Sequence, residues 1–340
     1  MPDPVTASKS KFAEFRAALY DCDAQRLRDQ LTSLCSSDCS IKLAHPMQWV
    51  TGPDALFDKA YAPLLDAIPD LERRDYIVVG AVDRGENWIG CGGYYTGVFE
   101  RPWLDIPPTQ HLVTMRYIEF FRIEHDRIVE LCLLWDIPQL MMQADAWPMA
   151  PSLGVEFHVP GPATHDGIVD KPCDEQQSAA SMQLVRNMVD GLSKYADGGH
   201  DAMQLERFWH PKMNWYGPAG IGSNRRISGF RNWHQVPFLN ALPDRSANTK
   251  DGGYDCFFAD GNYVAFCGWP AMHATVSGDG WMGIAPSDKK IDFCSLDIWR
   301  CENGMLRENW VLVDLLDIYK QLGVDVLERM RDITFARRRS

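Results

Sequence analysis

The spacing of hydrophobic residues changes along the chain, and the changes come in the same order in both halves. Near the start of each half, apolar residues recur every three or four positions, between Phe12 and Leu19 and between Met182 and Leu192. This spacing predicts an amphipathic helix. Later runs rich in β-branched and aromatic residues, bounded by turn residues, predict strands. The runs are Tyr76–Val79, Tyr117–Ile123, Ile128–Trp135, Tyr263–Cys267, Ile291–Cys301 and Met305–Val313.

Turn residues divide these helices and strands. A shorter helix is expected after Gly52-Pro53 and after Gly229. Glu302-Asn303-Gly304 predicts a β-hairpin, and Glu124-His125-Asp126 is its weaker counterpart in the first half. Helices followed by an antiparallel meander predict an α+β unit.

The two halves also resemble each other in sequence. Residues 118–130 recur as residues 296–308, at an offset of 178 residues, and Asp136 falls on Asp314 at the same offset. Such an ordered series indicates an internal repeat. The matching pairs further upstream are Cys91-Gly92 with Cys267-Gly268, Ala67–Asp70 with Ala241–Asp244, and His45-Pro46 with His210-Pro211.

We therefore expect two tandem domains of one fold. The first domain is predicted over residues 10–146 and the second over residues 178–335. Residues 147–177 between them carry Pro and Gly but keep apolar side chains, which favours an ordered connector over a flexible tether. A chain of 340 residues also exceeds the usual size of a single hydrophobic core.

Composition and charge narrow the range of functions. The 34 Lys and Arg against 46 Asp and Glu give a net charge of −12, and the basic residues are scattered except at Arg337–Arg339. Binding to nucleic acid is not expected, because phosphates require clustered positive charge. No run of eighteen apolar residues and no signal-peptide profile occurs, so we expect a cytoplasmic protein without a membrane partner.

The chain lacks the motifs of metal-dependent and nucleotide-dependent enzymes. It contains no HExxH, no phosphate-binding glycine loop, no GxSxG and no dinucleotide fingerprint. The ten cysteines show no zinc-site spacing, since the close pair Cys35 and Cys39 has no second pair, and cysteines within strands suit buried apolar positions. Neither a metal nor an organic cofactor is expected.

Four segments of the second half carry a family resemblance: His234–Arg245, Cys267–Gly278, Leu296–Arg300 and Glu308–Gly323. In this order they resemble the SnoaL-like polyketide cyclases of the nuclear transport factor 2-like (NTF2-like) superfamily, in a tandem form. The first half keeps the same order of segments but differs from the family's sequence pattern at several polar positions. The resemblance implies two cone-shaped α+β domains, each a curved, mostly antiparallel sheet wrapped around helices that leaves a conical pocket.

Asp297 is the main catalytic candidate, since an ionisable residue inside an apolar strand must face solvent or be held for a reason. Ser295 and Trp299 share its face by alternation. The resemblance implies that a pocket carboxylate, helped by a nearby His, moves protons at carbon. By alignment, Asp297 occupies the position of the family's pocket His, and the usual Asp position falls near Val311. This departure leaves Asp297 or Asp314 as the proton carrier.

Two histidines could assist the carboxylate. By alternation, His273 shares a face with Trp269 and could pair with Asp297 across the sheet. His234 lies on the short helix, facing Trp233 and Phe238. Aromatic side chains suit the walls of a pocket for a flat ligand, although core packing explains them equally well. The candidate substrate-binding residues are Trp215, Trp233, Phe238, Trp269, Trp299 and Trp310, and a secondary pocket in the first domain would use Glu119, Asp136, Trp49, Tyr95 and Trp135.

The first functional hypothesis is a cofactor-independent enzyme of the aldol or retro-aldol lyase, cyclase, dehydratase or isomerase type. It would act at a carbon next to a carbonyl or hydroxyl of a small oxygenated substrate, aromatic ones included. The second domain would carry the chemistry and the first would complete an intramolecular pseudo-dimer, with a homodimer as a further option. The alternative hypothesis is a non-catalytic module that binds a small ligand or a protein partner through the same cone.

Overall fold

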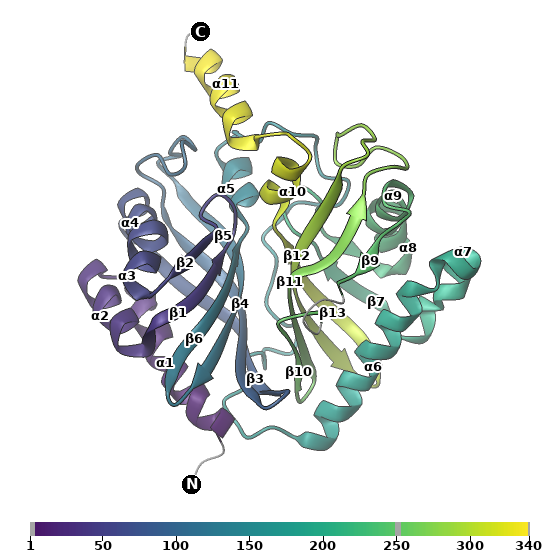
Figure 1. Ribbon diagram of the computed structural model, residues 1–340, viewed down its shortest axis with the longest axis horizontal. Coiled ribbons are helices and arrows are strands. Elements are labelled where there is room, and N and C mark those ends of the chain that lie inside the picture. Colours follow the sequence, from purple (N-terminus) through teal and green to yellow (C-terminus); the bar gives the residue numbers. More distant parts are fainter. Residues whose placement is uncertain (1–3, 249–252, 339–340) are drawn as a thin grey trace.

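The computed structural model describes residues 4–248 and 253–338 and contains two α+β domains (Figure 1). The first domain comprises α1 (Pro4–Tyr20), α2 (Ala24–Leu34), β1 (Cys35–Leu43), β2 (Trp49–Thr51), α3 (Pro53–Leu56), the π-helical η1 (Phe57–Tyr61), α4 (Ala62–Ala67), β3 (Glu72–Asp83), β4 (Glu86–Val98), β5 (Leu112–Glu124), β6 (Arg127–Trp135) and α5 (Ile137–Gln143).

The second domain repeats this order with small variations. It comprises α6 (Glu175–Ser193), α7 (Tyr195–Met203), the 3-10 turn η2 (Leu205–Arg207), β7 (Trp209–Tyr216), β8 (Asn224–Arg225), α8 (Arg226–Phe230), the π-helical η3 (Arg231–Gln235), α9 (Val236–Ala241), β9 (Ser246–Ala247), β10 (Cys256–Asp260), β11 (Tyr263–Thr275), β12 (Lys290–Glu302), β13 (Met305–Val313), α10 (Leu315–Gln321) and α11 (Val326–Arg338).

The two sheets have the same topology. The first runs β2-β1-β6-β5-β4-β3 and the second β8-β7-β13-β12-β11-β10, with β9 also paired to β11. The pairs β1–β6 and β7–β13 are parallel, and the other neighbours are antiparallel. Each domain is therefore a mostly antiparallel sheet, as expected from the hairpins.

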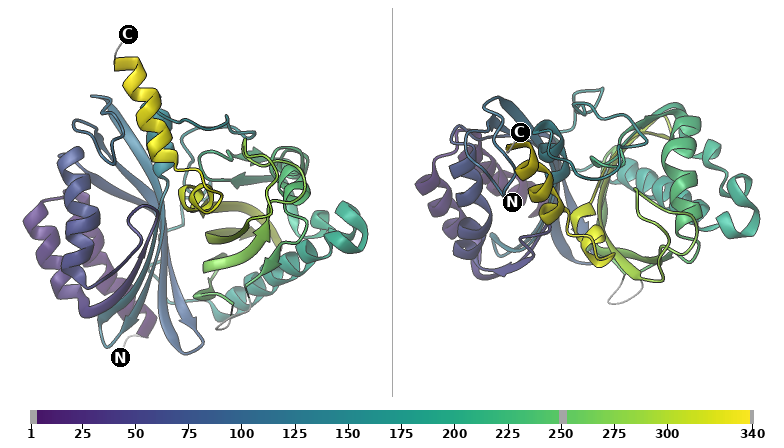
Figure 2. Two further views of the ribbon diagram at one scale, coloured as in Figure 1. Left: turned by 45° about the horizontal axis from the view of Figure 1, so that its top comes forward. Right: turned by 90° about the horizontal axis from the view of Figure 1, so that it is seen from above.

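The sheets lie against each other at the centre of the molecule (Figures 1 and 2). Helices α1–α4 and α6–α9 lie on the far sides of the two sheets, whereas α5, α10 and α11 lie at the top of the view in Figure 1. We call the face toward a domain's own helices the inner face, and the face toward the other domain the interdomain face. Strand β10 contacts β3, and the rings of Phe120 and Phe258 meet across the junction at 6.1 Å. Burial of both interdomain faces joins the domains through apolar contacts.

The connector contacts both domains along its course. Ile168 forms a bridge to Val78 of the first sheet, and Val155 forms one to Ser223 of the second domain. The carbonyl oxygen of Pro160 accepts a hydrogen bond from the Trp310 indole at 3.0 Å. These contacts hold the segment on the surface of both domains.

The predicted hairpins are present, and their turns explain the residues found there. Asn303 and Gly304 have φ of 51° and 73°, and His125 and Asp126 have φ of 48° and 61°. Two consecutive left-handed residues suit the right-handed twist of the paired strands, and Asn, Asp and Gly tolerate that conformation best. The predicted opening helices are α1 and α6.

Two local predictions need correction. The short helix of the second domain begins at Arg226, and Gly229 lies inside it. The match of Cys91 with Cys267 is displaced by one residue, since Cys91 pairs with Glu119 whereas Phe266 pairs with Asp297. A displacement of one residue moves a side chain to the other face of the sheet, so Cys91 is on an inner face and Cys267 on the interdomain face.

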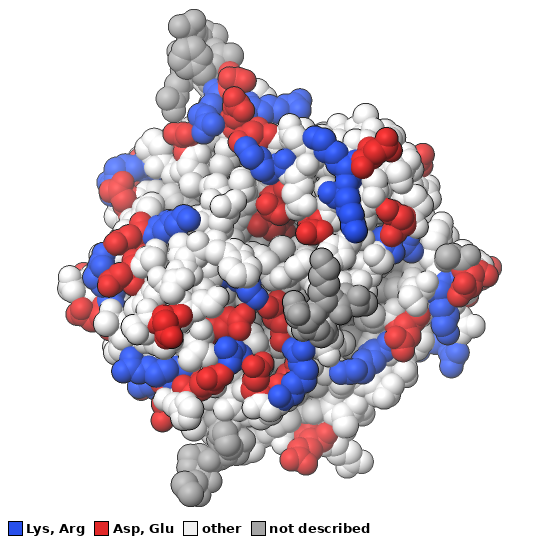
Figure 3. All heavy atoms as spheres, viewed as in Figure 1, with Lys and Arg blue, Asp and Glu red and all other residues white. Residues whose placement is uncertain are grey.

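Charges of both signs alternate over the face shown in Figure 3, and no continuous basic area covers it. Among the residues that the structure describes, none of the helices combines the length and the apolar character that a membrane crossing requires.

Candidate active site in the second domain

Asp297 lies in the middle of β12 on the inner face of the second sheet. Trp299, two residues further along the same face, packs against Phe257 with ring centroids 6.4 Å apart. The guanidinium of Arg186 from helix α6 lies over the Phe257 ring at 5.2 Å. Alternation along β12 therefore directs Asp297 toward the helices and away from the first domain.

The carboxylate of Asp297 has polar partners but no cationic one. Ser295 donates a hydrogen bond to it at 2.8 Å, and the amide of Asn309 donates a longer one at 3.4 Å. Within the described residues, Asp297 forms no ion pair. Burial raises the pKa of Asp297 to about 6, even though both hydrogen bonds favour the ionised form. A carboxylate of this kind is mostly ionised at neutral pH and can accept a proton.

His234 lies above the same face, on η3. Its ring stacks on Trp215 at 4.1 Å and is flanked by Phe230 and Phe238 at 5.3 and 5.5 Å. Burial lowers the pKa of His234 to about 3, so the imidazole is neutral at pH 7. Its buried Nδ1 has no hydrogen-bond partner among the described residues. A neutral imidazole can donate one hydrogen bond and accept another.

The pairing of strands β7 and β13 links His234 to Asp297 through Trp215 and Asn309. Trp215, on which His234 stacks, pairs with Asn309 across the parallel strands β7 and β13. Asn309 in turn donates to Asp297. Sequence reasoning placed Ser295 on this face but missed Asn309. Only the pairing of β13 with β7 and β12 brings Asn309 between His234 and Asp297. Sequence reasoning also missed the buried Gln235, whose Oε1 has no partner among the described residues.

Solvent reaches this face despite the covering helices. Asp297, Ser295, Phe266, His234 and Phe238 are all partly exposed, although each lies between the sheet and the helices. Fully packed cores leave such residues without access to water. The inner face of the second domain is thus partly open and lined mainly by aromatic rings.

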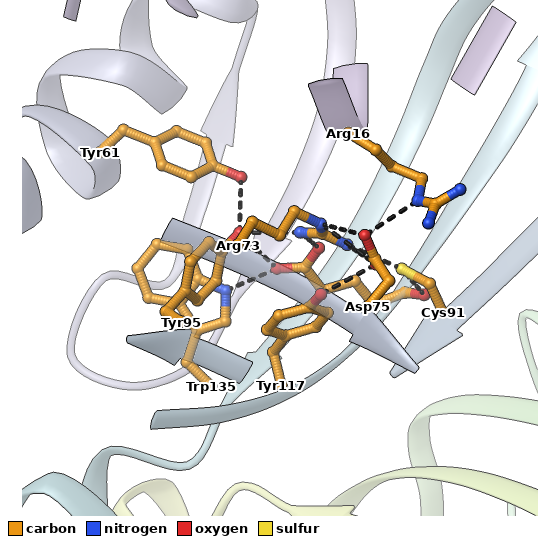
Figure 4. Close-up of polar contacts among 9 residues, drawn as sticks. Arg16, Tyr61, Arg73, Asp75, Cys91, Tyr95, Tyr117 and Trp135 are labelled. Atoms are coloured by element: carbon orange, nitrogen blue, oxygen red, sulfur yellow. Dashed lines mark hydrogen bonds and ion pairs between the residues drawn. The ribbon is translucent and has the colours of Figure 1, made fainter. Parts of the chain in front are cut away.

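The equivalent acidic residue of the first domain has a different environment (Figure 4). Glu119 is fully buried and accepts hydrogen bonds from Arg73 at 2.5 Å, Tyr95 at 3.2 Å and Trp135 at 2.8 Å. Tyr61 contacts the Tyr95 hydroxyl at 3.3 Å. The carboxylate is paired with a cation and enclosed by three aromatic side chains, so the predicted secondary pocket is filled.

A second carboxylate completes this network. Asp75 contacts Arg73 at 3.0 Å and Arg16 at 2.9 Å, and it accepts a hydrogen bond from the Tyr117 hydroxyl at 2.8 Å. The two arginines hold the pKa of Asp75 below its usual value against the opposing effect of burial. Figure 4 shows the Asp75 carboxylate beside Arg73, and Glu119 contacts the same guanidinium at 2.5 Å. The network stabilises the first domain and leaves neither carboxylate free for a ligand.

The predicted pairing of His273 with Asp297 is wrong. His273 pairs in register with Asp292, and its Nδ1 lies 2.5 Å from the Asp292 carboxylate. Asp297 pairs instead with Phe266, an even-numbered residue of β11. Alternation then places His273 on the opposite face from Asp297, which the sequence did not reveal because it does not fix the register.

Asp314 and Asp136 also lie away from the Asp297 cluster. Asp314 precedes α10 and accepts hydrogen bonds from the backbone amides of Asp317 at 3.2 Å and His45 at 2.8 Å. Asp136 accepts from Arg116 at 3.0 Å and from the amide of Ala219 at 3.1 Å. Burial raises the pKa of Asp314 to about 7. Each carboxylate joins its own domain to a segment of the other.

The six aromatic candidates separate into four groups. Trp215, Phe238 and Trp299 lie on the inner face. Trp310 is fully buried on the interdomain face, near Tyr76 and Tyr216. Trp269 is partly buried where β11 is irregular. Trp233 is 52% exposed and, in the first domain, Trp49 is 61% exposed, so neither forms part of an inner wall.

Among the described residues, the side chains around Asp297 do not form a group that could hold a metal ion. The one such group lies on the interdomain face and consists of Cys132, Asp255 and Cys267. Its donors are far apart in sequence, so the spacing of the cysteines gave no indication of it.

Comparisons with known proteins found one family model and several solved structures that match part of the chain. The family model described as SnoaL-like polyketide cyclase matches residues 189–322. A structure assigned as a SnoaL-like polyketide cyclase from Jannaschia sp. CCS1 has 18% identity and a TM-score of 0.36, covering 42% of this chain and 94% of its own. IdmH, assigned as a polyketide cyclase from Streptomyces antibioticus, has 16% identity and a TM-score of 0.35, covering 41% and 98%.

A third similar structure carries a different assignment. AclR from Streptomyces galilaeus, assigned as a hydroxylase, has 18% identity and a TM-score of 0.36, covering 43% of this chain and 86% of its own. No curated protein sequence matches the chain. The family match falls on the domain that carries Asp297 and His234.

Proposed function

From the premise that the second domain is a SnoaL-like domain, we propose that it is a cofactor-independent acid–base catalyst. It removes a proton from a carbon next to a carbonyl group of a small oxygenated substrate and returns it there or elsewhere. The observation that carries this proposal is Asp297, a partly buried carboxylate without a cationic partner among the described residues. Strongly perturbed carboxylates in clefts are typical of catalytic acids and bases.

The reaction begins with ionised Asp297. Its carboxylate accepts the proton as the C–H bond breaks, and the bonding electron pair moves into the carbonyl to form an enolate. His234, neutral at working pH, donates a hydrogen bond to the developing oxyanion or accepts one from a substrate hydroxyl. The proton then leaves Asp297 for the same carbon, another carbon or a departing oxygen, which corresponds to exchange, isomerisation or elimination.

The surrounding side chains define the substrate class. Trp215, Phe238, Phe266 and Trp299 offer apolar ring surfaces on the inner face. His234 Nδ1, which donates or accepts according to the tautomer, and the acceptor Oε1 of Gln235 are buried without partners among the described residues. Such a site suits a flat, largely apolar molecule with a few oxygen substituents.

Deuterium exchange tests the proposal without knowledge of the product. The full chain is incubated in D2O with a panel of flat cyclic and aromatic ketones, and deuterium incorporation next to the carbonyl is followed by mass spectrometry. We expect at least one ketone to exchange with wild-type protein and not with Asp297→Asn. A ketone that binds in the second domain but exchanges at the buffer rate with wild-type protein would indicate a binding module and overturn the proposal.

A further inference from the structure

A group of thiols lies where the two sheets meet, on the opposite side of the second sheet from Asp297. Cys132 belongs to β6 of the first domain, and Cys267 belongs to β11 of the second. Their sulfur atoms and a carboxylate oxygen of Asp255 all lie within 4.8 Å of one another. The three residues are far apart in sequence and come from both domains, so the fold alone brings these donors together.

A third thiol adjoins the group. Cys256 pairs directly with Cys267 across the antiparallel strands β10 and β11. The Cys267 thiol also donates a long hydrogen bond to the Asp255 carboxylate at 3.8 Å. The group itself thus offers two sulfur donors and one oxygen donor, and three protein ligands leave the fourth position of a tetrahedral site open.

The carboxylate of Asp255 is held in place from outside the cluster. Lys42 of the first domain contacts one carboxylate oxygen, and the backbone amide of Trp269 donates to the other at 2.9 Å. Lys42 also contacts Glu130 at 3.0 Å. Supporting contacts of this type orient ligands in metal sites.

We propose that Cys132, Cys267 and Asp255 bind a thiol-preferring divalent cation of the Zn2+ class. Sulfur-rich donor sets select such ions over Mg2+ or Ca2+, which require oxygen ligands. The site would join the two domains through a metal ion, in addition to their apolar contact.

The charges balance when one divalent cation replaces the protons of the two cysteine thiols. Zn2+ binds cysteine as the thiolate, so each of the two cysteine ligands gives up its proton on binding. Binding replaces two thiol protons by one divalent ion: the two S–H bonds break, two metal–sulfur bonds form, and two protons go to solvent. The net charge of the buried group is unchanged, and Lys42 still balances Asp255.

Metal titration of the reduced full chain tests the proposal. After treatment with a chelator and its removal, we expect calorimetry to show uptake of one equivalent of Zn2+. With Co2+ as the probe, we expect the sulfur-to-cobalt charge-transfer band of thiolate ligation. Zn2+ should also raise the melting temperature, because it binds the folded state alone.

Matched variants locate the site. Cys132→Ser and Cys267→Ser should lose the cobalt band and the Zn2+-dependent rise in melting temperature. Cys301→Ser removes a buried thiol of the same domain outside the cluster and should retain both. Circular dichroism establishes that each variant is folded, and the wild-type cobalt spectrum is informative even where a variant is not.

Three results would overturn the proposal: no stoichiometric uptake by wild-type protein, a cobalt complex without the thiolate band, or unchanged binding by both cluster variants. A disulfide between Cys132 and Cys267 that forms in air and persists with Zn2+ present would also overturn it. Since the cluster and Asp297 occupy opposite faces of the sheet, none of these results bears on the proposed catalytic function.

Discussion

The inner faces of the two domains carry an acidic residue at the same position of the same strand, but the two residues differ in every contact. Glu119 is fully buried and paired with Arg73, whereas Asp297 is partly exposed and has only neutral partners among the described residues. Both carboxylates sit among aromatic rings. The comparison shows that the neighbours, and not the acidic residue itself, decide whether a buried carboxylate stabilises the fold or remains available for chemistry.

The sheet registers show how the partners of Glu119 are absent from the second domain. Arg73 pairs with Tyr95, and the residues at these places in the second sheet are the paired Ala247 and Met272. Trp135 pairs with Tyr117, and their counterparts are the paired Val313 and Ser295. The cation, one hydroxyl and the indole that surround Glu119 are therefore all replaced by side chains that cannot neutralise a carboxylate.

Strand structure accounts for the difference in access. In the first domain, β3 is one continuous strand of 12 residues, and it holds Arg73 fully buried. In the second domain, its place is shared by β9 and β10, and Ala247 of β9 is exposed. Among the described residues, this edge of the inner face therefore carries an exposed alanine where the first domain has a buried arginine. The two domains thus share one architecture and differ in the access of solvent to the acidic residue on the inner face.

The largest expected effect comes from removing each carboxylate in turn and measuring turnover. Asp297→Asn should lower the deuterium-exchange rate by about 10²–10⁴-fold, the usual contribution of a general base. Glu119→Gln should change the rate per folded molecule less than twofold, about the error of such assays, since its carboxylate is enclosed. Equal losses of rate in both variants would mean that the two inner faces are functionally alike, which would contradict the contrast between Asp297 and Glu119.

The free energy of unfolding should respond to Glu119→Gln, the variant that leaves the exchange rate almost unchanged. Glu119→Gln leaves Arg73 buried with only Asp75 as a charged partner, and we expect a loss of about 3 kcal/mol, the low end for breaking a buried ion pair. Urea denaturation measures this loss. Glu124→Gln, at the exposed end of the same strand, is the control and should cost less than about 0.5 kcal/mol. A small loss at Glu119 would show that the network contributes little.

The pH dependence of stability distinguishes the carboxylates further. The pKa of Asp297 is raised in the folded state, so between about pH 4 and pH 6 the folded chain binds more protons than the unfolded chain. Stability from this group is present below pH 4 and is lost as the pH rises through 6. Asp297→Asn should therefore be more stable than wild type at pH 8, by about 1 to 2 kcal/mol after allowance for partial exposure.

Denaturation curves at pH 4 and pH 8 measure this difference, which should vanish at the lower pH. Asp314 also has a raised pKa, but it is present in both proteins and cancels in the comparison. A variant less stable than wild type at pH 8 would mean that the Asp297 carboxylate holds the fold together, as Glu119 does.

The sequence predicted the fold more completely than the candidate site. The hairpins and the opening helices were predictable because period-two and period-3.6 patterns and left-handed turn residues are local signals. Strand β1 was missed because its residues alternate poorly: Ser36, Ser37, Asp38 and Ser40 interrupt the apolar pattern. Tertiary pairing with β6, which no local signal records, makes it a strand.

At the site, alternation along β12 was sufficient to bring Ser295 and Trp299 to the face of Asp297. The error at His273 arose between strands, where a partner depends on register that a single strand does not reveal. Arg73 and Asn309 were missed for the same reason, since each acts on a carboxylate of another strand. Residues that act within one strand were therefore placed correctly, whereas between strands only some were: Tyr95 and Trp135 were grouped with Glu119, but Arg73 and Asn309 were not recognised.

The smallest expected effect concerns the hydrogen bond that tunes Asp297. Ser295 donates at 2.8 Å and favours the ionised carboxylate, so Ser295→Ala should raise the pKa of Asp297 by about half a unit to one unit. The acid limb of the exchange-rate profile, which rises with pH through about 6 in wild type, should move to higher pH by that amount. Rates well above pH 7 should stay within about twofold, because Asp297 is then ionised in both proteins. An unmoved limb would assign the ionisation to a group other than Asp297, and the contrast between the two inner faces would then concern stability alone.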